Sequence, residues 1–401
     1  MDHPRHAGGF VWEWRDHALW RTLPDGGRAL SYGGDFGEEV HDGSFVCDGL
    51  IDALSRPYAG TWAWVAAMAP AAPALARAIE ESRSASGREE QRLRALTDSP
   101  VTVGSSSDEA GAAYRLTECG SLARVGDVPV IVSLSVFRAP TDNDRGRGPV
   151  DYWGISADDL GPLGVGRGES GTFHVERWER ARLHLLRRRL VSVEDEGELR
   201  RVVERWSPPA AQFGVTLTWE YAPCRVGEAL ARGVAVRLHV APYGSWPPRV
   251  PRLGVRIELP GSQWSASWLG DTMIGYPDMV VPDARGFGHA DVRDLWDVSV
   301  RPQEGGHRGG LEALDLRGEA GELVVLPESV LGWSACPWSE RELAEASHWE
   351  ELSESNRLFL WLDVFHDGIG TRSCGPDSLP GFAGRMRECE VTFVIAQVGG
   401  D

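Results

Sequence analysis

The sequence lacks an excess of basic residues. Its 401 residues include 41 Lys and Arg against 59 Asp and Glu, which gives a formal net charge of −18. Binding to nucleic acid requires a basic surface that neutralises phosphates, and binding to an anionic membrane requires clustered basic side chains. The composition therefore argues against a nucleic acid or a membrane surface as the partner.

Long apolar runs and paired cysteines are also missing. No stretch approaches the roughly 20 apolar residues of a spanning helix, and residues 1–6 lack the apolar core of a signal peptide. The six cysteines lie far apart and form no Cys-x-x-Cys pair. Scattered thiols in a chain of this length predict single buried cysteines in a reducing cytoplasm rather than a disulfide framework.

Tryptophan, by contrast, is unusually abundant. The chain has 17 Trp, 11 Phe and 7 Tyr. Large sheet cores account for most tryptophans, because a buried indole covers much apolar surface. Flat indole faces also stack on the apolar faces of sugar rings, so the excess fits a carbohydrate-related function.

The first quarter of the chain divides into two parts. Residues 1–52 are loop-like and rich in Gly and aromatic residues, and Phe10-Val11-Trp12 within them predicts a short buried strand. Residues 53–98 contain two stretches rich in Ala, Glu, Arg and Leu, at 73–81 and 88–96. These stretches predict a surface helix or a partly ordered linker.

Beyond about residue 99, apolar residues alternate with small or polar ones. This period of two is clear at 213–221, 234–240, 253–259 and 391–395. Alternation punctuated by Gly and Pro pairs is typical of antiparallel sheets with one solvated face. The sequence therefore predicts a mainly β chain with a large antiparallel β-sandwich over residues 99–401.

Four short motifs are better explained by structure than by chemistry. Residues 164–168 are Gly-rich but lack the Lys-Ser/Thr of a phosphate loop, which predicts a surface loop. His3 and His6 sit on an unanchored terminus, which argues against a metal site. Asp142-Asn143-Asp144 lacks the alternate spacing of a calcium loop and predicts turn and cap contacts. Cys374 has no neighbouring base, so it is not a candidate nucleophile.

Six longer strings stand out in order along the chain: GGFVWEW (8–14), YGGDFG (32–37), FVCDGL (45–50), FRAPTDND (137–144), VRPQEGGHR (300–308) and FHDGIGTRSCGP (365–376). The first three resemble the last strand and loops of the TIM barrel in the large β-galactosidases of glycoside hydrolase family 2. The other three are similar to motifs of the C-terminal β-sandwich of these enzymes, the small-chain domain. The resemblance implies a barrel remnant at 1–52, a linker in place of a shortened immunoglobulin-like domain at 53–98, and the small-chain sandwich at 99–401.

The resemblance also implies four site residues. Trp12 matches a tryptophan that forms the floor of the galactose-binding pocket. Phe45, through its backbone carbonyl, and Asp48, through a side-chain oxygen, match positions that hold a sodium ion. Cys374 matches a position where some members have a tryptophan that touches the leaving-group sugar, whereas others carry the same Ser-Cys-Gly-Pro.

The departures from the family concern catalysis. Retaining glycosidases need two carboxylates about 5 Å apart, flanking the glycosidic bond. In this family both carboxylates, and the ligands of the catalytic magnesium, come from barrel segments upstream of the matched part. The string WLGDTMIGYPD (268–278) keeps the Tyr-Pro-Asp of the family but lacks the Gly-Pro-x-Glu-Asn that normally precedes it. The acidic residues near Trp12 have simpler roles in turns, caps or cation binding; they are Glu13, Asp16, Asp35 and Asp48.

Two hypotheses follow for the activity. In the first, the chain is a truncated β-galactosidase polypeptide, without catalytic carboxylates, that hydrolyses terminal β-D-galactosides such as lactose only with a barrel-bearing partner chain. In the second, it is a non-catalytic carbohydrate-binding sandwich or an inactive remnant. Because a single barrel strand cannot close a barrel, we expect Phe10, Trp12 and Trp14 to lie against the sandwich or to stay partly exposed.

Overall fold

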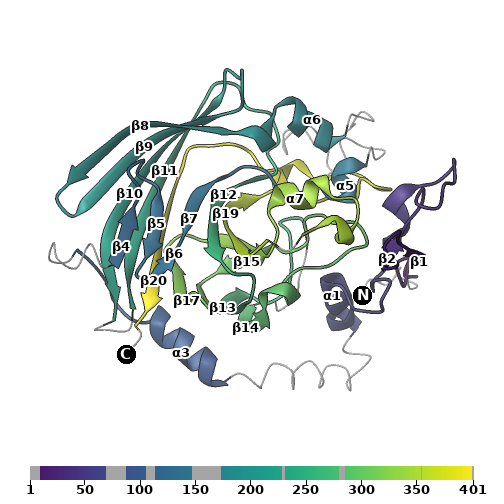
Figure 1. Cartoon of the computed structure of the whole chain (residues 1–401), viewed down its shortest axis with the longest axis horizontal. Helices are drawn as coiled ribbons and strands as arrows, with labels where there is room; N and C mark the ends of the chain where they lie inside the picture. The colour runs from purple at the N-terminus through teal and green to yellow at the C-terminus, as the bar shows by residue number, and fades with distance from the viewer. Residues whose placement is uncertain are drawn as a thin grey trace, which may run out of the picture.

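The computed structural model describes residues 10–68, 87–104, 113–146, 173–227, 231–279, 285–353 and 355–399. Antiparallel strands are the main regular structure of these residues, and the helices are short (Figure 1). The long strands lie at the left of Figure 1, and the N-terminal segment lies at the right. The motifs at 3–6 and 164–168 lie outside the described residues, as does the helical stretch expected at 73–81.

The larger of two main sheets has ten strands. Its order is β14 (Arg285–Asp291), β13 (Trp264–Asp271), β16 (Ala313–Gly318), β17 (Gly321–Pro327), β20 (Cys389–Val398), β11 (Ala231–Tyr243), β10 (Gly214–Val226), β9 (Leu199–Ser207) and β8 (Arg187–Glu196), with β3 (Val101–Val103) also paired to β10. The strand β20 thus joins two halves of the sheet, because it pairs with β17 on one side and β11 on the other.

The smaller main sheet has five strands and packs against the larger one. Its order is β15 (Arg308–Leu311), β18 (Leu331–Cys336), β19 (Arg357–His366), β12 (Arg252–Pro260) and β7 (Ile131–Ser135). Inward-facing residues of both sheets, such as Leu217, Val236 and Phe393 from one and Val255 and Leu360 from the other, belong to one buried cluster. The predicted antiparallel sandwich is confirmed.

Short elements complete the described chain. Two small sheets are β1 (Leu19–Thr22) with β2 (Arg28–Ser31), and β4 (Tyr114–Leu116) with β5 (Leu122–Val125) and β6 (Val128–Pro129). The α-helices are α1 (Ala59–Met68), α3 (Gly87–Thr97), α5 (Asp142–Arg145), α6 (His174–Arg180) and α7 (Glu340–Glu345), and the 3-10 helices are η1 (Gly43–Val46), η5 (Leu183–Leu185), η6 (Val292–Asp294), η7 (Trp349–Glu351) and η8 (Pro380–Phe382). No helix in the described ranges is long and apolar enough to cross a membrane.

Tryptophans in the sandwich take the core role expected of them. Trp178, Trp333 and Trp361 are fully buried. Trp268 packs edge-on against Trp333 at 5.2 Å between ring centroids, and the Arg308 guanidinium lies over both rings. Stacked or edge-on aromatic pairs contribute about 1 kcal/mol beyond the area that they bury.

The N-terminal prediction was wrong in one respect. Phe10-Val11-Trp12 is not a strand, and the Phe10 side chain is fully exposed. The backbone pairs a few residues later instead: Leu50 donates its amide to the Glu13 carbonyl, and Ile51 donates to the Trp14 carbonyl. Phe10, Trp12 and Trp14 are all exposed, so of the two expected outcomes, contact with the sandwich or partial exposure, the second is confirmed.

Two elements near the N-terminus were not predicted. The hairpin β1–β2 turns at Asp25 and Gly26, where the positive φ of Gly26 (+87°) is a conformation that glycine adopts without strain. Helix α1 lies ahead of the stretches expected to be helical. Of the two alternatives for 88–96, a surface helix or a partly ordered linker, the structure has the helix: α3 covers this stretch and buries Leu93 and Leu96 against the sheet.

The cysteine prediction is confirmed only in part. All six cysteines are free thiols, so no disulfide framework is present. Cys224 and Cys336 are buried as expected, but Cys119 and Cys374 are exposed. Both exposed thiols lie in turns rather than in the sheets, where no neighbouring strand or second sheet covers them.

Candidate functional site

The N-terminal segment docks onto loops of the sandwich. The Tyr32 hydroxyl donates to the Ser347 carbonyl (2.8 Å), and the Tyr32 ring stacks on His348 at 4.9 Å between centroids. His348 Nε2 also contacts the Asp35 carboxylate at 2.8 Å. These contacts hold residues 19–38 against the loop that follows α7.

A second contact joins the segment to the sandwich at the start of α1. The Ala59 amide, which is unpaired within its own helix, donates to Asp297 Oδ2 at 3.2 Å. Burial raises the pKa of Asp297 to about 6, although the Ala59 amide and the Arg308 charge oppose that rise. The acid from the sandwich therefore caps a helix of the N-terminal segment.

The short helix α5 is the centre of the candidate site. Thr141 is its N-cap: its hydroxyl accepts from the Asp144 amide, while the Asp144 carboxylate accepts from the Thr141 amide. The same carboxylate forms a two-point ion pair with Arg138, and both residues are fully buried. The prediction that Asp142-Asn143-Asp144 acts in turns and caps is confirmed, and its ion pair with Arg138 is an addition.

Helix α5 brings together two of the segments that the resemblance singled out. The Ser44 hydroxyl, next to Phe45, donates to Asp142 Oδ1 at 2.7 Å. On the other side, Asn143 donates to the Gly370 carbonyl (2.8 Å) and accepts from the Ser373 hydroxyl (2.6 Å), next to Cys374. The expected cation segment and the expected leaving-group loop are thus both bonded to one helical turn.

The side chains of the predicted site residues all face solvent. The exposed fraction is 86% for Trp12 and 41% for Phe45, and Asp48 and Cys374 are also exposed. Next to Trp12, a backbone bond between Glu13 and Leu50 ties this part of the chain to the Asp48 segment. Because most of the Trp12 side chain is exposed, the described residues do not enclose a sugar pocket around it.

The acidic residues near Trp12 have structural partners. Glu13 pairs with His17 at 2.7 Å, and Asp16 accepts from the Gly49 amide (2.8 Å) and from Tyr58. Burial raises the pKa of Asp16, and these two hydrogen bonds only partly offset that rise. The contacts of Glu13 and Asp16 are thus structural ones, as expected for these two residues.

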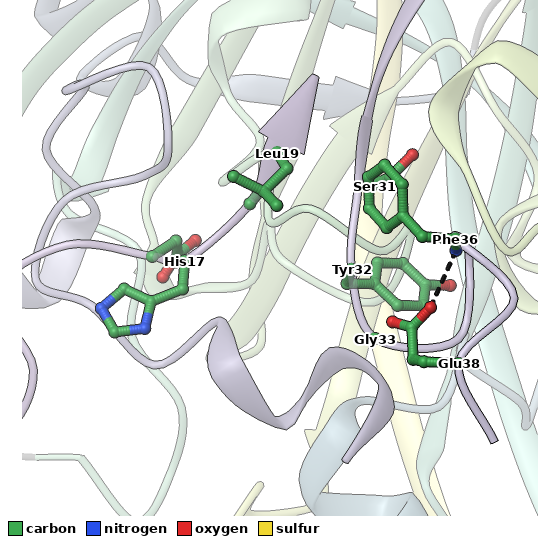
Figure 2. A pocket seen from close by; sticks show the side chains of 9 residues that line it. His17, Leu19, Ser31, Tyr32, Gly33, Phe36 and Glu38 are labelled. Carbon is green, nitrogen blue, oxygen red and sulfur yellow. Dashed lines mark hydrogen bonds between the residues drawn. The ribbon is translucent and has the colours of Figure 1, made fainter. Parts of the chain in front are cut away.

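A cavity of about 530 Å³ lies within the N-terminal segment (Figure 2). Leu19, Tyr32 and Phe36 supply most of its apolar wall. The Glu38 carboxylate at its edge accepts the backbone amides of Gly34 and Phe36, and Figure 2 shows the second of these bonds. Asp16 and His17 also line the cavity, so its wall is apolar with three titratable groups, Glu38 included.

Phe45 and Asp48 do not complete the expected sodium site by themselves. Phe45 and Asp48 offer one carbonyl and one carboxylate, which are the hard oxygen donors that such a cation prefers. Hard cations commonly collect about six oxygens, and two donors on an exposed loop do not make that set. Among the described residues, no group of three or more His, Cys, Asp or Glu side chains is placed to hold a metal ion.

A buried ionic network behind the Cys374 loop was not predicted. Arg249 pairs with Asp367 and with Asp377, and His174 Nε2 lies 3.0 Å from Asp377. Burial alone would raise the pKa of Asp377, but the His174 hydrogen bond and the charges of Arg249 and Arg372 outweigh it and lower the pKa to about 2. Its residues are far apart in sequence, and no short motif contains them.

The retained Tyr-Pro-Asp string has a role in the same loop. Asp278 accepts the backbone amides of Ile369 (3.1 Å) and Gly370 (2.7 Å). Together with Asn143, it fixes the backbone ahead of Cys374. The Cys374 loop is thus held from three directions, and its exposed tip is positioned rather than free.

Comparison with known proteins decides the family. The family model described as β-galactosidase small chain matches residues 116–395. The chain belongs to this family. A second model, the TIM barrel domain of family 2 glycosyl hydrolases, matches residues 1–64. The resemblance is therefore confirmed both for the N-terminal motifs and for those of the sandwich.

Curated relatives of this small-chain family member are named β-galactosidases. The one from Arthrobacter sp. (strain B7) is 28% identical, over 95% of this chain and 46% of its own length. Those from Staphylococcus xylosus and Kluyveromyces lactis are 21% and 24% identical, over 46% and 44% of their lengths. The chain therefore spans about half the length of the curated relatives that it matches.

One solved structure is also similar. A galactose mutarotase-related enzyme from Lactobacillus acidophilus matches at 10% identity with a TM-score of 0.30, over 67% of this chain and 83% of that chain.

Proposed function

We propose that this chain is the C-terminal part of a β-galactosidase, acting in the cytoplasm, and that it hydrolyses terminal β-D-galactosides only together with a chain that carries the rest of the barrel. Both family matches support this, since one falls on the sandwich and the other on the end of a barrel. The absence of any disulfide among the six cysteines supports the compartment.

One observation carries the proposal. Helix α5 bonds the Phe45 segment on one side and the Cys374 loop on the other, so the sandwich holds both at fixed positions. Trp12 meanwhile presents 86% of its surface to solvent. Such groups are preorganised but uncovered, as the rim of a sugar site would be before the rest of the barrel is in place.

In this arrangement the residues of this chain bind and orient rather than cleave. The Trp12 indole would stack on the apolar face of the galactose ring, and the Cys374 loop would border the leaving group. Phe45 and Asp48 would provide two oxygens of a sodium site whose other ligands come from the partner. The two carboxylates that donate a proton and attack the sugar, and the magnesium ligands, would belong to the barrel-bearing chain.

The test uses a chromogenic β-galactoside. We expect the pure chain to hydrolyse it no faster than buffer, and activity to appear after addition of the upstream part of the Arthrobacter relative, ending where its match to this chain begins. A Trp12→Ala variant should lose most of that activity. Trp20→Ala changes another half-exposed tryptophan of the same segment and is the matched control.

Two results would contradict the proposal. Turnover by the pure chain that Glu13→Gln or Asp48→Asn abolishes would place the catalytic carboxylates in this chain. Retention on immobilised galactose without any activity in the mixture would favour the alternative, a non-catalytic carbohydrate-binding sandwich.

A further inference from the structure

We propose that the outer edge of β8 pairs with β8 of a second copy of this chain, so that two ten-stranded sheets join in a two-fold antiparallel dimer. The proposal concerns a surface on the far side of the sandwich from the N-terminal segment (Figure 1). It does not depend on the proposed function.

The first observation is an open strand edge. β8 is the last strand of its sheet and pairs with β9 on one side only. Eight of its ten residues are exposed. An exposed edge offers a row of unpaired amides and carbonyls to another strand, and sheets usually blunt such edges with charge or a bulge. β8 has both charges and a bulge. The arrangement of these charges therefore decides whether β8 of a second copy is repelled or can pair with it.

The charges of β8 are ordered along the strand. Arg187, Arg188 and Arg189 come first, an apolar centre follows, and Glu194, Asp195 and Glu196 end the strand. When two copies run antiparallel, the basic half of each lies beside the acidic half of the other. A parallel pair, or a pair shifted by half a strand, would bring like charges together, and like charges directly opposite are destabilising.

The β-bulge in β8 places basic and acidic residues of its two halves on the same face of the sheet. Arg189 pairs with Arg205 of β9, and Glu194 pairs with Arg201, with the register shift between Leu190 and Ser192. Because Arg205 and Arg201 are four positions apart, they point to the same face of the sheet. Arg189 and Glu194 therefore share that face, although they are five residues apart.

A two-fold axis between Val191 and Ser192 then places Arg189 of each copy opposite Glu194 of the other. The same operation places Arg188 opposite Asp195 and keeps that pair on a shared face. Without the extra residue of the bulge, each arginine would point away from its acid. The bulge thus makes the register centred between Val191 and Ser192 complementary to itself.

Arg188 and Asp195 already have partners in their own chain, Glu204 and Arg200. Arg189 and Glu194 do not have such an ion pair in the described ranges. Arg189 lies beside the like-charged Arg205, and within the described ranges it has no ion pair. Glu194 faces Arg201, whose guanidinium is already held by Glu196 and Glu220. A second copy would give Arg189 a counter-charge and Glu194 an arginine that it need not share with Glu196 and Glu220, in addition to about one backbone hydrogen bond per paired residue.

The experiment is a charge exchange, read by analytical ultracentrifugation of the full chain near physiological salt. We expect wild type to dimerise, and Arg189→Glu and Glu194→Arg each to raise the dimer dissociation constant at least about tenfold, because each change puts two like-charge pairs into the interface. Mixing the two variants should restore association, since every pair is then opposite in charge.

Controls separate this surface from others. Arg341→Glu makes the same charge change on an exposed residue of α7 and should leave dimerisation as in wild type. Thermal unfolding checks that each variant is folded. A monomeric wild type overturns the proposal, as does a mixture that fails to associate. Dimers that neither variant weakens would show that the chain associates elsewhere, for example through its exposed N-terminal aromatic residues, and would equally overturn it.

Discussion

Replacing Asp144 by asparagine removes one charge from the centre of the candidate site while keeping its shape. The amide oxygen can still accept from Thr141, so the cap of α5 is largely preserved. What is lost is the counter-charge of Arg138, whose side chain is fully buried. Breaking a buried ion pair by removing one partner costs about 3–5 kcal/mol, because the other charge is left in a medium that solvates it poorly.

The surroundings of Arg138 place the expected loss at the lower end of that range. Asp367 and Glu304 also act on the Arg138 charge, so its burial is not wholly uncompensated after the substitution. We expect Asp144→Asn to lower the free energy of unfolding by about 3 kcal/mol. Urea unfolding followed by tryptophan fluorescence measures this as a lower midpoint at unchanged slope.

Two further variants make the reasoning refutable. Asp142→Asn is the matched control on the same helix; it loses part of its contacts with Ser44 and Gln303 and should cost about 1 kcal/mol. Arg138→Met combined with Asp144→Asn removes the stranded charge and should recover most of the loss. If Asp144→Asn costs no more than Asp142→Asn, or the double variant is no better than the single one, the stranded charge is not the cause.

Three other predictions concern pH and backbone space. Because the pKa of Asp297 is raised to about 6, the folded state keeps a proton that the unfolded state releases between about pH 4 and 6. The free energy of unfolding should therefore fall by about 2–3 kcal/mol as pH rises through that window. Urea titrations at several pH values should show that Asp297→Asn removes this pH dependence. The pKa of Asp377 is lowered to about 2, so its contribution to the free energy of unfolding is present above about pH 4. About 2 kcal/mol of that free energy is lost as pH falls toward 2. The Asp377→Asn variant should not show this loss in acid unfolding. A Cβ at Gly49 would lie 2.3 Å from the Asp16 amide, so Gly49→Ala should loosen the N-terminal segment and speed its cleavage by protease. In α1, a Cβ at Gly60 meets nothing within 4 Å, so Gly60→Ala should stabilise the protein by about 0.5–1 kcal/mol. Equal cleavage of the two variants would contradict the steric argument.

The sheets could be predicted from sequence because their signal is local. Alternation at 213–221 and 391–395 follows from one face of β10 and β20 being buried, and each strand carries that record in its own residues. The hairpin β1–β2 could also have been found, since Asp25-Gly26 is a common turn pair. The local signal of Phe10-Val11-Trp12 gave a wrong prediction. Its apolar residues suit a strand, but the described chain does not place a partner strand beside them.

The candidate site was predictable only as far as motifs reach. The string at 137–144 predicts a helix cap, and the structure has one. The ion pair of Arg138 with Asp144 and the network around Asp377 could not be read, because burial and long-range pairing decide which charges meet. Sequence gives the identity of such residues, but only the packed fold determines that they are buried together.

The central place of β20 also sets an order of folding. Residues 214–226, 231–243 and 313–327, which form β10, β11, β16 and β17, all leave the ribosome before β20 does. Until it arrives, β11 and β17 each present a bare edge, and the two halves of the sheet have no strand between them. Pairings this distant in sequence form slowly and leave edges open to other chains. Synthesis at low temperature or with chaperones should therefore raise the yield of folded protein, because it protects these edges until the last strand is inserted.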